Sequence, residues 1–297
     1  MKGTRILLDP RRPEGLSFTS HAHSDHAPRG SVGERLIASK ETRGLLGFPG
    51  EGKREFEFNG LRFRVLNAGH ILGSSQLCVE DGFTLVYTGD MNLAGGLTTG
   101  KAEVPKKCDV LILEATFGSP RYVFPPRVEV LKEIRDWADG CFAKGTRPVL
   151  LAYALGKAQE LTKGLSMNLG IRVDPSVLRF NQRYESLGVD LGRYGPYEEG
   201  EDGDYVVIAP PGTRGRWEGH PRAFVSGWAL DGNAARRYGV EEAFPVSAPS
   251  DFPSLLEYVE KAQPQVVYTV HGSAGELSEE LRARGFYSEP LSGLRYL

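Results

Sequence analysis

A six-residue segment near the N-terminus has the residue types and the spacing of a metal site. It reads H-x-H-x-D-H and follows an apolar segment that ends at Phe18; its defining residues are His21, His23, Asp25 and His26. Residues two apart on an extended segment point the same way, so His21 and His23 can bind one ion. Asp25 and His26 lie further along the turn and can face a second ion. Imidazole nitrogens and carboxylate oxygens are zinc-type ligands, although ligand type leaves manganese and iron open.

Three further residues can complete such a site. His70 follows Gly69, Asp90 follows Gly89, and His271 precedes a glycine; each comes directly after a predicted strand. A rigid sheet can aim side chains at the ends of its strands. A lone residue of this kind is more often structural, but the histidine cluster reverses that expectation. Five of the six histidines therefore lie in three motifs that predict metal binding.

The elements that must position these residues begin with hairpins. Paired strand segments flank Asn59-Gly60 and Asp81-Gly82, dipeptides that favour two-residue turns because they tolerate positive φ. The expected strands are residues 55–58 with 61–65, and 76–80 with 83–87. The continuous apolar run at residues 109–114 predicts a buried strand.

After Gly118 the pattern alternates between helix and strand, which predicts an α/β region. Helices are expected at residues 127–143, 156–164 and 251–262, with strands at 147–152, 205–209, 223–225 and 265–270. A last helix is expected to open with a capping box between Ser273 and Glu276 and to close at Gly285. The acidic run at residues 198–204 predicts a solvated loop.

Composition narrows the class of protein. The chain has 297 residues, 40% of them hydrophobic and 25% charged, which excludes disorder and coiled coil. With 36 basic against 38 acidic residues it is not globally basic, so any nucleic-acid contact must use a local basic channel. Three cysteines without a C-x-x-C pair predict a reducing environment. No targeting segment or apolar stretch of membrane-spanning length is evident, so we expect a cytoplasmic protein.

In these motifs the chain resembles the metallo-β-lactamase superfamily, and more narrowly its β-CASP nuclease branch, which includes RNase J, the mRNA 3′-end-processing endonuclease and ligase-associated exonucleases. Further segments carry the resemblance: Asp9 before Pro10, G-H-I-L-G-S at residues 69–74, Glu114 in E-A-T-F-G, L-G-K-A-Q-E at residues 155–160, and F-V-S-G-W at residues 224–228. The resemblance implies an αββα sandwich, an α/β class of four layers, with a small inserted α/β domain. The implied domains are residues 1–119 and 240–297 for the sandwich and residues 120–239 for a short β-CASP-like insertion.

The resemblance also implies a role for each site residue. One divalent ion would be bound by His21, His23 and His70, and a second by Asp25, His26 and His271, with Asp90 bridging the two. Asp9 and Glu114 would orient ligand imidazoles, so the implied catalytic set is Asp9, Asp25, Asp90 and Glu114. The implied reaction is phosphodiester hydrolysis by a hydroxide that the two ions activate.

One departure from the family pattern concerns catalysis. In the family a histidine before the last helix is thought to assist the leaving group, and here that position is Pro249, which cannot donate a proton. A general acid is typically worth roughly 10²–10⁴-fold in rate. Water or another side chain could substitute, the nuclease could be slow, or the substrate could differ. His220, in a loop, is the only spare histidine.

Candidates for substrate binding are Lys157, beside a predicted helix N-terminus, and three arginines in loops. These arginines are Arg12, Arg214 and Arg216.

The sequence favours a metal-dependent nuclease that acts on RNA or single-stranded DNA. Two other classes stay open: a nucleic-acid-binding or complex-forming relative with weakened turnover, and a metallohydrolase for small esters or thioesters. The choice between RNA and DNA, the polarity, exo- or endonuclease action, and a homodimer or a processing or repair complex also stay open. Within the resemblance, a histidine at position 271 instead of an apolar residue weakly favours RNA as the substrate.

Overall fold

The computed structural model describes residues 3–30 and 36–291 and divides the chain into two compact units. Unit 1 comprises residues 1–123 and 249–297, and unit 2 comprises residues 124–248. The sequence placed the insertion at residues 120–239, so its start is close to the observed one but its end comes too early. The reason is that strand β14 (Glu242–Phe244) pairs in parallel with β13 (Arg222–Val225) and so belongs to the sheet of unit 2.

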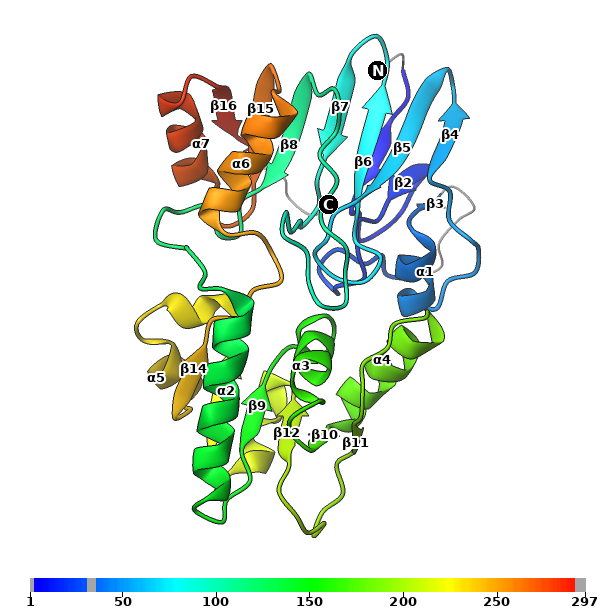
Figure 1. The fold of residues 1–297 in the computed structure, drawn as a ribbon. Helices are drawn as coiled ribbons and strands as arrows, with labels where there is room; N and C mark the ends of the chain where they lie inside the picture. The colour runs from blue at the N-terminus through cyan, green and yellow to red at the C-terminus, as the bar shows by residue number, and fades with distance from the viewer. Residues whose placement is uncertain (1–2, 31–35, 292–297) are drawn as a thin grey trace. The chain divides into compact units, whose positions relative to one another are not determined.

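Unit 1 contains two sheets (Figure 1). The larger has the order β16-β15-β8-β7-β6-β5-β4, and the smaller, a parallel sheet, has the order β1-β2-β3. The strands of the larger sheet are β4 (Glu55–Phe58), β5 (Leu61–Asn67), β6 (Ser75–Glu80), β7 (Thr84–Tyr87), β8 (Val110–Glu114), β15 (Val266–Val270) and β16 (Tyr287–Pro290). The smaller sheet contains β1 (Ile6–Leu8), β2 (Leu16–Phe18) and β3 (Leu36–Ile37), and the helices are α1 (Lys40–Leu46), α6 (Phe252–Ala262) and α7 (Ala274–Ala283).

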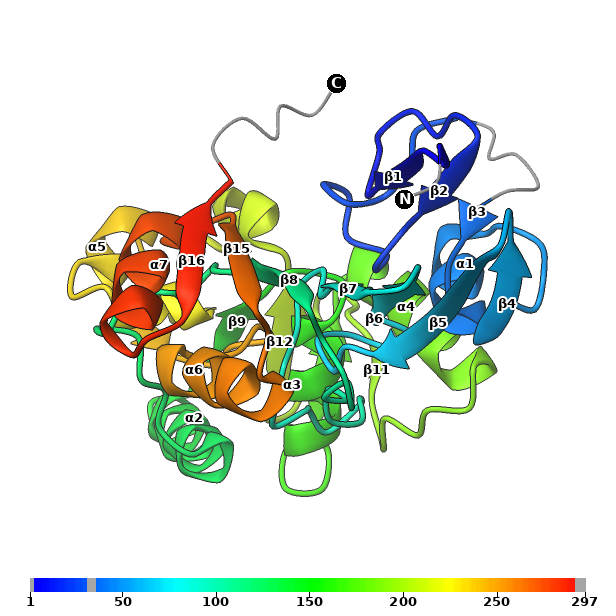
Figure 2. The ribbon, with the colours of Figure 1, turned by 90° about the horizontal axis from the view of Figure 1, so that it is seen from above.

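The two faces of the larger sheet bury different layers. Side chains alternate along a strand, so Cys78 on β6 and Leu111 on β8 join a core with α6 and α7, while Leu77 on β6 packs toward the smaller sheet with Phe18. Figure 2 shows α6 and α7 beside β15, and β1 to β3 as a separate small sheet. The sequence of layers is therefore helix, sheet and sheet, and the predicted α/β sandwich is confirmed.

Both predicted hairpins form, β4 with β5 and β6 with β7. Asn59 and Gly60 both have positive φ, at 52° and 75°, as the turn requires, whereas in the second hairpin the positive φ is at Gly82. The predicted capping box at α7 is wrong, because the Ser273 side chain makes no cap hydrogen bond. The backbone at Ser273 has ψ of 44° instead of the extended value that brings an N-cap hydroxyl over the first turn.

Unit 2 is built on a six-stranded parallel sheet of order β11-β10-β12-β9-β13-β14. The remaining strands are β9 (Val149–Leu151), β10 (Ile171–Val173), β11 (Gly195–Pro196) and β12 (Val206–Ala209). The helices are α2 (Arg127–Phe142), α3 (Lys157–Leu165), α4 (Pro175–Ser186) and α5 (Ala234–Tyr238), with 3₁₀ turns η1 (Pro211–Trp217) and η2 (Gly227–Leu230). Helices α2, α3 and α4 bury their apolar sides against one face of this sheet.

The chain leaves unit 1 and returns to it at one place. The backbone N–H of Phe252, at the start of α6, donates to the carbonyl of Tyr122 at 3.0 Å. The two ends of the connection are therefore neighbours within unit 1. In the ranges that the structure describes, no helix combines the length and the apolar character needed to cross a membrane.

Candidate metal centre

The carboxyl ends of several strands meet at one edge of unit 1. Strands β7, β8 and β15 are parallel, and β5 runs in the same direction because it is antiparallel to β6. The loops that follow β5, β7 and β15 carry His70, Asp90 and His271, and β8 ends in Glu114. In the smaller sheet Asp9 follows β1 and the H-x-H-x-D-H segment follows β2.

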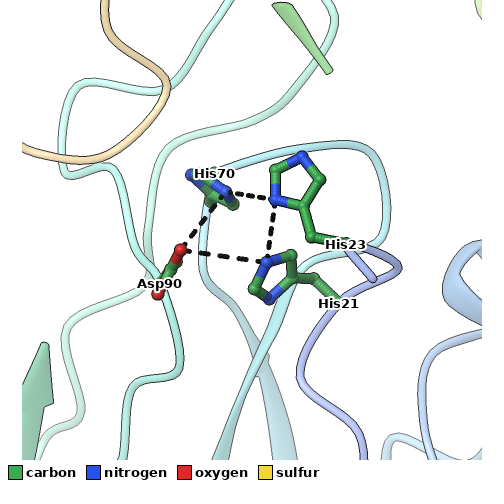
Figure 3. A group of neighbouring side chains, drawn as sticks. All are labelled: His21, His23, His70 and Asp90. Carbon is green, nitrogen blue, oxygen red and sulfur yellow. Dashed lines mark hydrogen bonds and ion pairs between the residues drawn. The ribbon is translucent and has the colours of Figure 1, made fainter. Parts of the chain in front are cut away.

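Four of the predicted ligands converge on one point (Figure 3). Nδ1 of His23 lies 3.0 Å from Nε2 of His21 and 3.2 Å from Nε2 of His70. Oδ2 of Asp90 lies 3.8 Å from His21 Nε2 and 3.6 Å from His70 Nε2. Ligand atoms around a tetrahedral zinc ion, at 2.0–2.1 Å from the metal, are about 3.3 Å apart. The observed spacing is therefore that of a tetrahedral ligand set.

The hydrogen bonds of His21 show which nitrogen faces the centre. The Ser20 hydroxyl donates to Asp9 at 2.7 Å, so it accepts from Nδ1–H of His21 at 2.9 Å. Nε2 of His21 then carries a lone pair, and it points at the nitrogens of His23 and His70. Burial, followed by the charges of His26, His23, His70 and His271, holds the pKa of His21 well below its usual value. Nδ1 of His23, Nε2 of His70 and the Asp90 carboxylate converge with this lone pair, so the donor set fits a cation.

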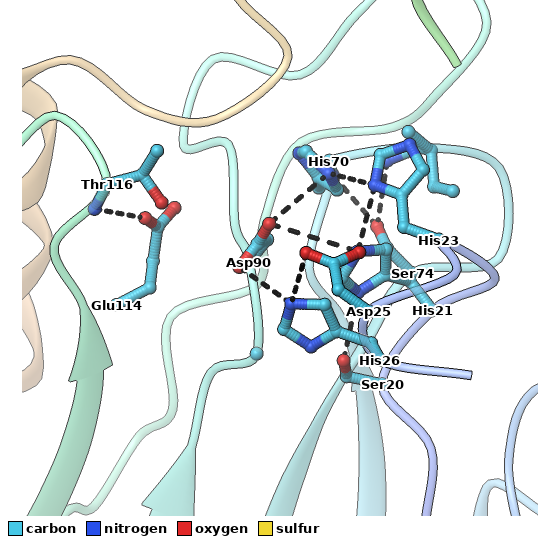
Figure 4. Close-up of polar contacts among 12 residues, drawn as sticks. Ser20, His21, His23, Asp25, His26, His70, Ser74, Asp90, Glu114 and Thr116 are labelled. Carbon is cyan, nitrogen blue, oxygen red and sulfur yellow. Dashed lines mark hydrogen bonds and ion pairs between the residues drawn. The ribbon is translucent and has the colours of Figure 1, made fainter. Parts of the chain in front are cut away.

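A second group lies on the other side of Asp90 (Figure 4). Oδ1 of Asp90 is 3.7 Å from Nε2 of His26, whereas its Oδ2 faces the first group, so this carboxylate is placed as a bridge. Oδ2 of Asp25 is 3.8 Å from the same nitrogen of His26, although the Asp25 side chain is 63% exposed. The rings of His26 and His271 are 5.7 Å apart. This group is looser than the first, and the second ion remains a prediction.

Asp9 is the anchor of the second group. Its carboxylate accepts from the backbone N–H and the hydroxyl of Ser20, from the hydroxyl of Tyr87 at 2.8 Å, and from Nδ1 of His26 at 2.8 Å. Burial opposes a charge on His26, but the hydrogen bond to Asp9 and the charges of Asp90, Asp9 and Asp25 raise its pKa to about 9. The bond to Asp9 leaves Nε2 of His26 facing the centre, which is the orienting role that the resemblance implied.

Glu114 does not have the role that the resemblance implied. Its carboxylate is fully buried and accepts from the backbone N–H groups of Met91, at 3.1 Å, and Thr116, at 2.9 Å, instead of from an imidazole (Figure 4). It can do so because β8 ends beside the loop that carries Asp90. Burial, and next the charge of Asp90, raise its pKa to about 8. Glu114 therefore holds the Asp90 loop.

The backbone around the site is unusual. Asp9 and His271 have φ of 46° and 65°, values that L-residues rarely adopt and that cluster at functional sites. Gly89, with φ of 53°, lies so near Ser20 that a Cβ would be 2.5 Å from the serine Cβ. The glycine of the G-D motif therefore lets the loop after β7 approach the segment after β2.

Two functional side chains were not predicted. Ser20 links Asp9 to His21, and Tyr87 donates to Asp9 from the end of β7. Ser20 directly precedes the histidine segment, which is the only sequence signal for it. Tyr87 faces the smaller sheet because of the strand alternation, but its partner becomes visible only in the structure.

Of the candidates for substrate binding, Arg12 lines a crevice of unit 1 together with His26 and His271, whereas Lys157, Arg214 and Arg216 belong to unit 2. Arg12 is exposed in unit 1, and Lys157 is the first residue of α3 in unit 2, where burial lowers its pKa to about 8. Arg216 pairs with Asp174 at 3.5 Å and stacks on the buried Trp217.

Two other residues singled out by the sequence have packing contacts in unit 2. Arg214 donates to the carbonyl of Tyr238 at 3.1 Å. His220 bonds to the carbonyl of Arg147 at 3.2 Å and packs against Trp217, which gives it a packing role.

The segment that carries Pro249 lies beside the Asp90 loop. The Ser250 backbone N–H donates to the carbonyl of Met91 at 2.8 Å, and its hydroxyl accepts from the N–H of Leu93 at 3.0 Å. Position 249 is therefore next to the loop that carries Asp90, and it offers no proton.

The chain is similar in sequence to several known proteins. A probable DNA ligase from Opitutus terrae is 36% identical, over 94% of this chain and 29% of that protein. Endoribonuclease YSH1 from Candida albicans is 27% identical, over 73% of this chain and 32% of that protein. An RNase J-like protein from Methanocaldococcus jannaschii is 25% identical, over 71% of this chain and 64% of that protein. The chain thus spans less than two thirds of each of these relatives.

Among solved structures, a protein of unknown function from Enterococcus faecalis superposes with a TM-score of 0.61 and 13% identity, over 94% of this chain and 79% of that one, which bears on the fold alone. No protein-family model matches the chain. The alignments extend across both units, and the relatives named as an RNase J-like protein and as endoribonucleases confirm the resemblance of this chain to the β-CASP branch of the metallo-β-lactamase superfamily.

Proposed function

We propose that this chain is a metal-dependent nuclease that hydrolyses phosphodiester bonds with two divalent ions, zinc being the favoured metal. The observation that carries the proposal is the convergence of three imidazole nitrogens and one carboxylate oxygen within 4.8 Å of one another. Three imidazole nitrogens and a carboxylate oxygen at this spacing are the donor set of a tetrahedral zinc site.

The residues have separable tasks in this proposal. His21, His23, His70 and Asp90 would hold one ion, and Asp90, His26, Asp25 and His271 the other. When bound, the pair supplies a Lewis acid for the phosphate and lowers the pKa of water. Asp9 keeps His26 in the tautomer whose Nε2 faces the centre. Ser20 does the same for His21, and Glu114 holds the loop that carries Asp90.

The chain lacks the family's side-chain donor for protonation of the leaving group. Pro249 occupies the position where the family has a histidine, and its neighbour Ser250 already bonds to the backbone of the Asp90 loop. We expect solvent to supply that proton and turnover to be slower than with a histidine by roughly 10²–10⁴-fold.

We propose single-stranded DNA as the preferred substrate. The relative named as a probable DNA ligase is 36% identical over 94% of this chain. The relatives named as endoribonucleases or RNase J-like are 25–27% identical over 71–73% of it, or 35% identical over only 35% of it. The assay therefore includes RNA, and faster cleavage of RNA than of DNA would contradict this preference. A cytoplasmic location and membership of a homodimer or a repair complex stay predictions, and three unpaired, buried cysteines support the location.

The test is hydrolysis of end-labelled single-stranded DNA and RNA of equal length, with added zinc or manganese and with a chelator. The variant is His70→Ala, and His220→Ala is the matched histidine control because His220 lies outside the metal centre. We expect metal-dependent cleavage that His70→Ala abolishes and His220→Ala retains, with DNA cleaved faster. Cleavage that survives both the chelator and His70→Ala contradicts the proposal.

A second candidate is a nucleic-acid-binding relative without turnover, and Pro249 favours it. Binding of the nucleic acid without cleavage, whichever metal is added, would identify this case. Absence of both cleavage and binding would instead point to a small ester or thioester.

A further inference from the structure

The loop that carries His70 is closed on itself. The Ser74 hydroxyl accepts from the backbone N–H groups of His70, at 2.8 Å, and Ile71, at 3.2 Å. The Ser74 carbonyl accepts from the N–H of Ala68 at 2.9 Å, at the base of the loop. Because these bonds tie the two sides of the loop together, a displacement of the backbone at Gly73 is passed on to His70.

One carbonyl of this loop accepts from three hydroxyl groups. The Gly73 carbonyl lies 2.6 Å from Oγ of Ser39, 2.9 Å from Oγ1 of Thr42 and 2.8 Å from Oγ of Ser75. A carbonyl oxygen has two lone pairs, so a third donor exceeds what its hydrogen bonding requires. Gly73 has φ of 78°, and a Cβ there would lie 2.6 Å from the backbone nitrogen of Thr42. The loop is therefore in close contact with the first turn of α1.

Two of these hydroxyls belong to α1 and are directed at the loop. Ser39 is the N-cap: its oxygen accepts from the N–H of Thr42 at 3.0 Å, and its proton goes to Gly73. A threonine in a helix commonly donates to a carbonyl of the preceding turn, but the fully buried Thr42 donates to Gly73 instead. We call Ser39 and Thr42 the α1 clamp.

The α1 clamp joins the two sheets of unit 1. Helix α1 follows β3 of the smaller sheet, and Gly73 lies between β5 and β6 of the larger sheet (Figure 1). The first group of ligands draws His21 and His23 from the segment after β2 in the smaller sheet, and His70 from the loop after β5 in the larger one. Metal–ligand distances are confined to within about 0.2 Å, so the position of one sheet relative to the other decides whether one ion can contact all three histidines.

We propose that Ser39 and Thr42 are positioning residues of the metal centre, which hold the His70 loop at the distance from His21 and His23 that a single ion requires. This inference rests on the metal centre of the proposed function and deepens it.

Loss of one clamp hydroxyl should weaken metal binding without abolishing it. The backbone N–H of Ser75 also donates to the carbonyl of Ser20, at 2.8 Å, and so joins the same two sheets. Partners that orient metal ligands from outside the ligand set typically account for roughly 10–100-fold in metal affinity. We therefore expect the lower end of this range for a single hydroxyl.

The experiment measures the zinc affinity of the full chain by competition with a chelator of known affinity. Thr42→Val removes the hydroxyl and keeps the shape of the side chain, whereas Thr42→Ser keeps the hydroxyl. Thr162→Val is the matched control, because Thr162 is also a fully buried helical threonine whose hydroxyl donates to a carbonyl, that of Ala158 at 2.8 Å, in unit 2. We expect an affinity about 10-fold lower in Thr42→Val and close to that of wild type in Thr42→Ser and Thr162→Val.

A second variant and two further measurements separate positioning from a general loss of folding. Ser39→Gly removes the other clamp hydroxyl, and since glycine is a good N-cap residue, α1 should still form. Its zinc affinity should also fall about 10-fold. Urea unfolding of the metal-free proteins gives the stability of each variant. The absorption spectrum of the cobalt-loaded protein reports the geometry of the ligands, and it should change in Thr42→Val but not in Thr162→Val.

The outcomes distinguish this inference from the proposed function. If Thr42→Val does not fold, Ser39→Gly decides. Unchanged zinc affinity in a folded Thr42→Val or Ser39→Gly, or an equal loss in Thr162→Val, overturns the α1 clamp even though the wild-type centre binds zinc. Absence of zinc binding by the wild-type protein contradicts the metal centre itself.

Discussion

Replacement of Glu114 by glutamine should change how the stability of the metal-free protein depends on pH. The unfolded chain loses this proton near the usual value of 4.5, whereas burial and the charge of Asp90 raise the pKa in the folded protein to about 8. Between these values the folded state holds a proton that the unfolded state has released, so wild-type stability falls as pH rises. The slope is about 1.4 kcal/mol for each pH unit and flattens near each pKa, so the loss between pH 5 and pH 8 is roughly 3.5 kcal/mol.

Urea unfolding of both proteins in a chelator, at half-unit steps of pH, checks this value. Glutamine does not titrate and can still accept one of the two backbone hydrogen bonds from Met91 and Thr116. The lost bond costs about 1–3 kcal/mol at every pH, so the informative quantity is the change of the difference with pH. The free energy of unfolding of the variant minus that of wild type should rise by roughly 3.5 kcal/mol from pH 5 to pH 8. Parallel curves would show that Glu114 titrates normally and would refute the reasoning.

Three further predictions concern the centre and the thiols. Asp90→Asn should lower bound metal to less than one ion per chain by mass spectrometry, because Asp90 contacts both ligand groups, while the exposed Asp136→Asn should not. Pro249→His should raise the rate of cleavage by up to roughly 10²–10⁴-fold at unchanged metal content if the missing proton limits turnover, and an unchanged rate would place the limit elsewhere. Cys108, whose pKa burial raises to about 12, should react with a thiol reagent only after unfolding, together with Cys78 and Cys141; fast labelling of the native protein would contradict their burial.

The four residues of the first group, His21, His23, His70 and Asp90, could be predicted from the sequence because each follows a strand. An apolar strand with a histidine or aspartate just after it gives both the position and the direction of that side chain, as at His70 and Asp90. Parallel pairing then brings these ends to one edge, although they are far apart in the chain. Neither step requires knowledge of distant contacts beyond the pairing of strands.

Other features depend on contacts that the sequence does not record. Glu114 has the residue type of an imidazole partner, but the end of β8 places it against backbone N–H groups. The Ser273 motif fits a capping box, but the local backbone does not bring the Ser273 hydroxyl over the first turn of α7. Helix α4 was not predicted, although its start is encoded in the dipeptide Asp174-Pro175, where Asp174 accepts from the N–H of Ser176.

The hydrogen bond between Tyr122 and Phe252 has a consequence for how such proteins diversify. A segment whose two ends meet inside its host adds little loop-closure entropy when its length changes, since a doubling of length costs only about 0.6 kcal/mol. The length of unit 2 can therefore change without moving the site residues of unit 1. In this architecture the size of unit 2 and the residues of the metal centre can change independently.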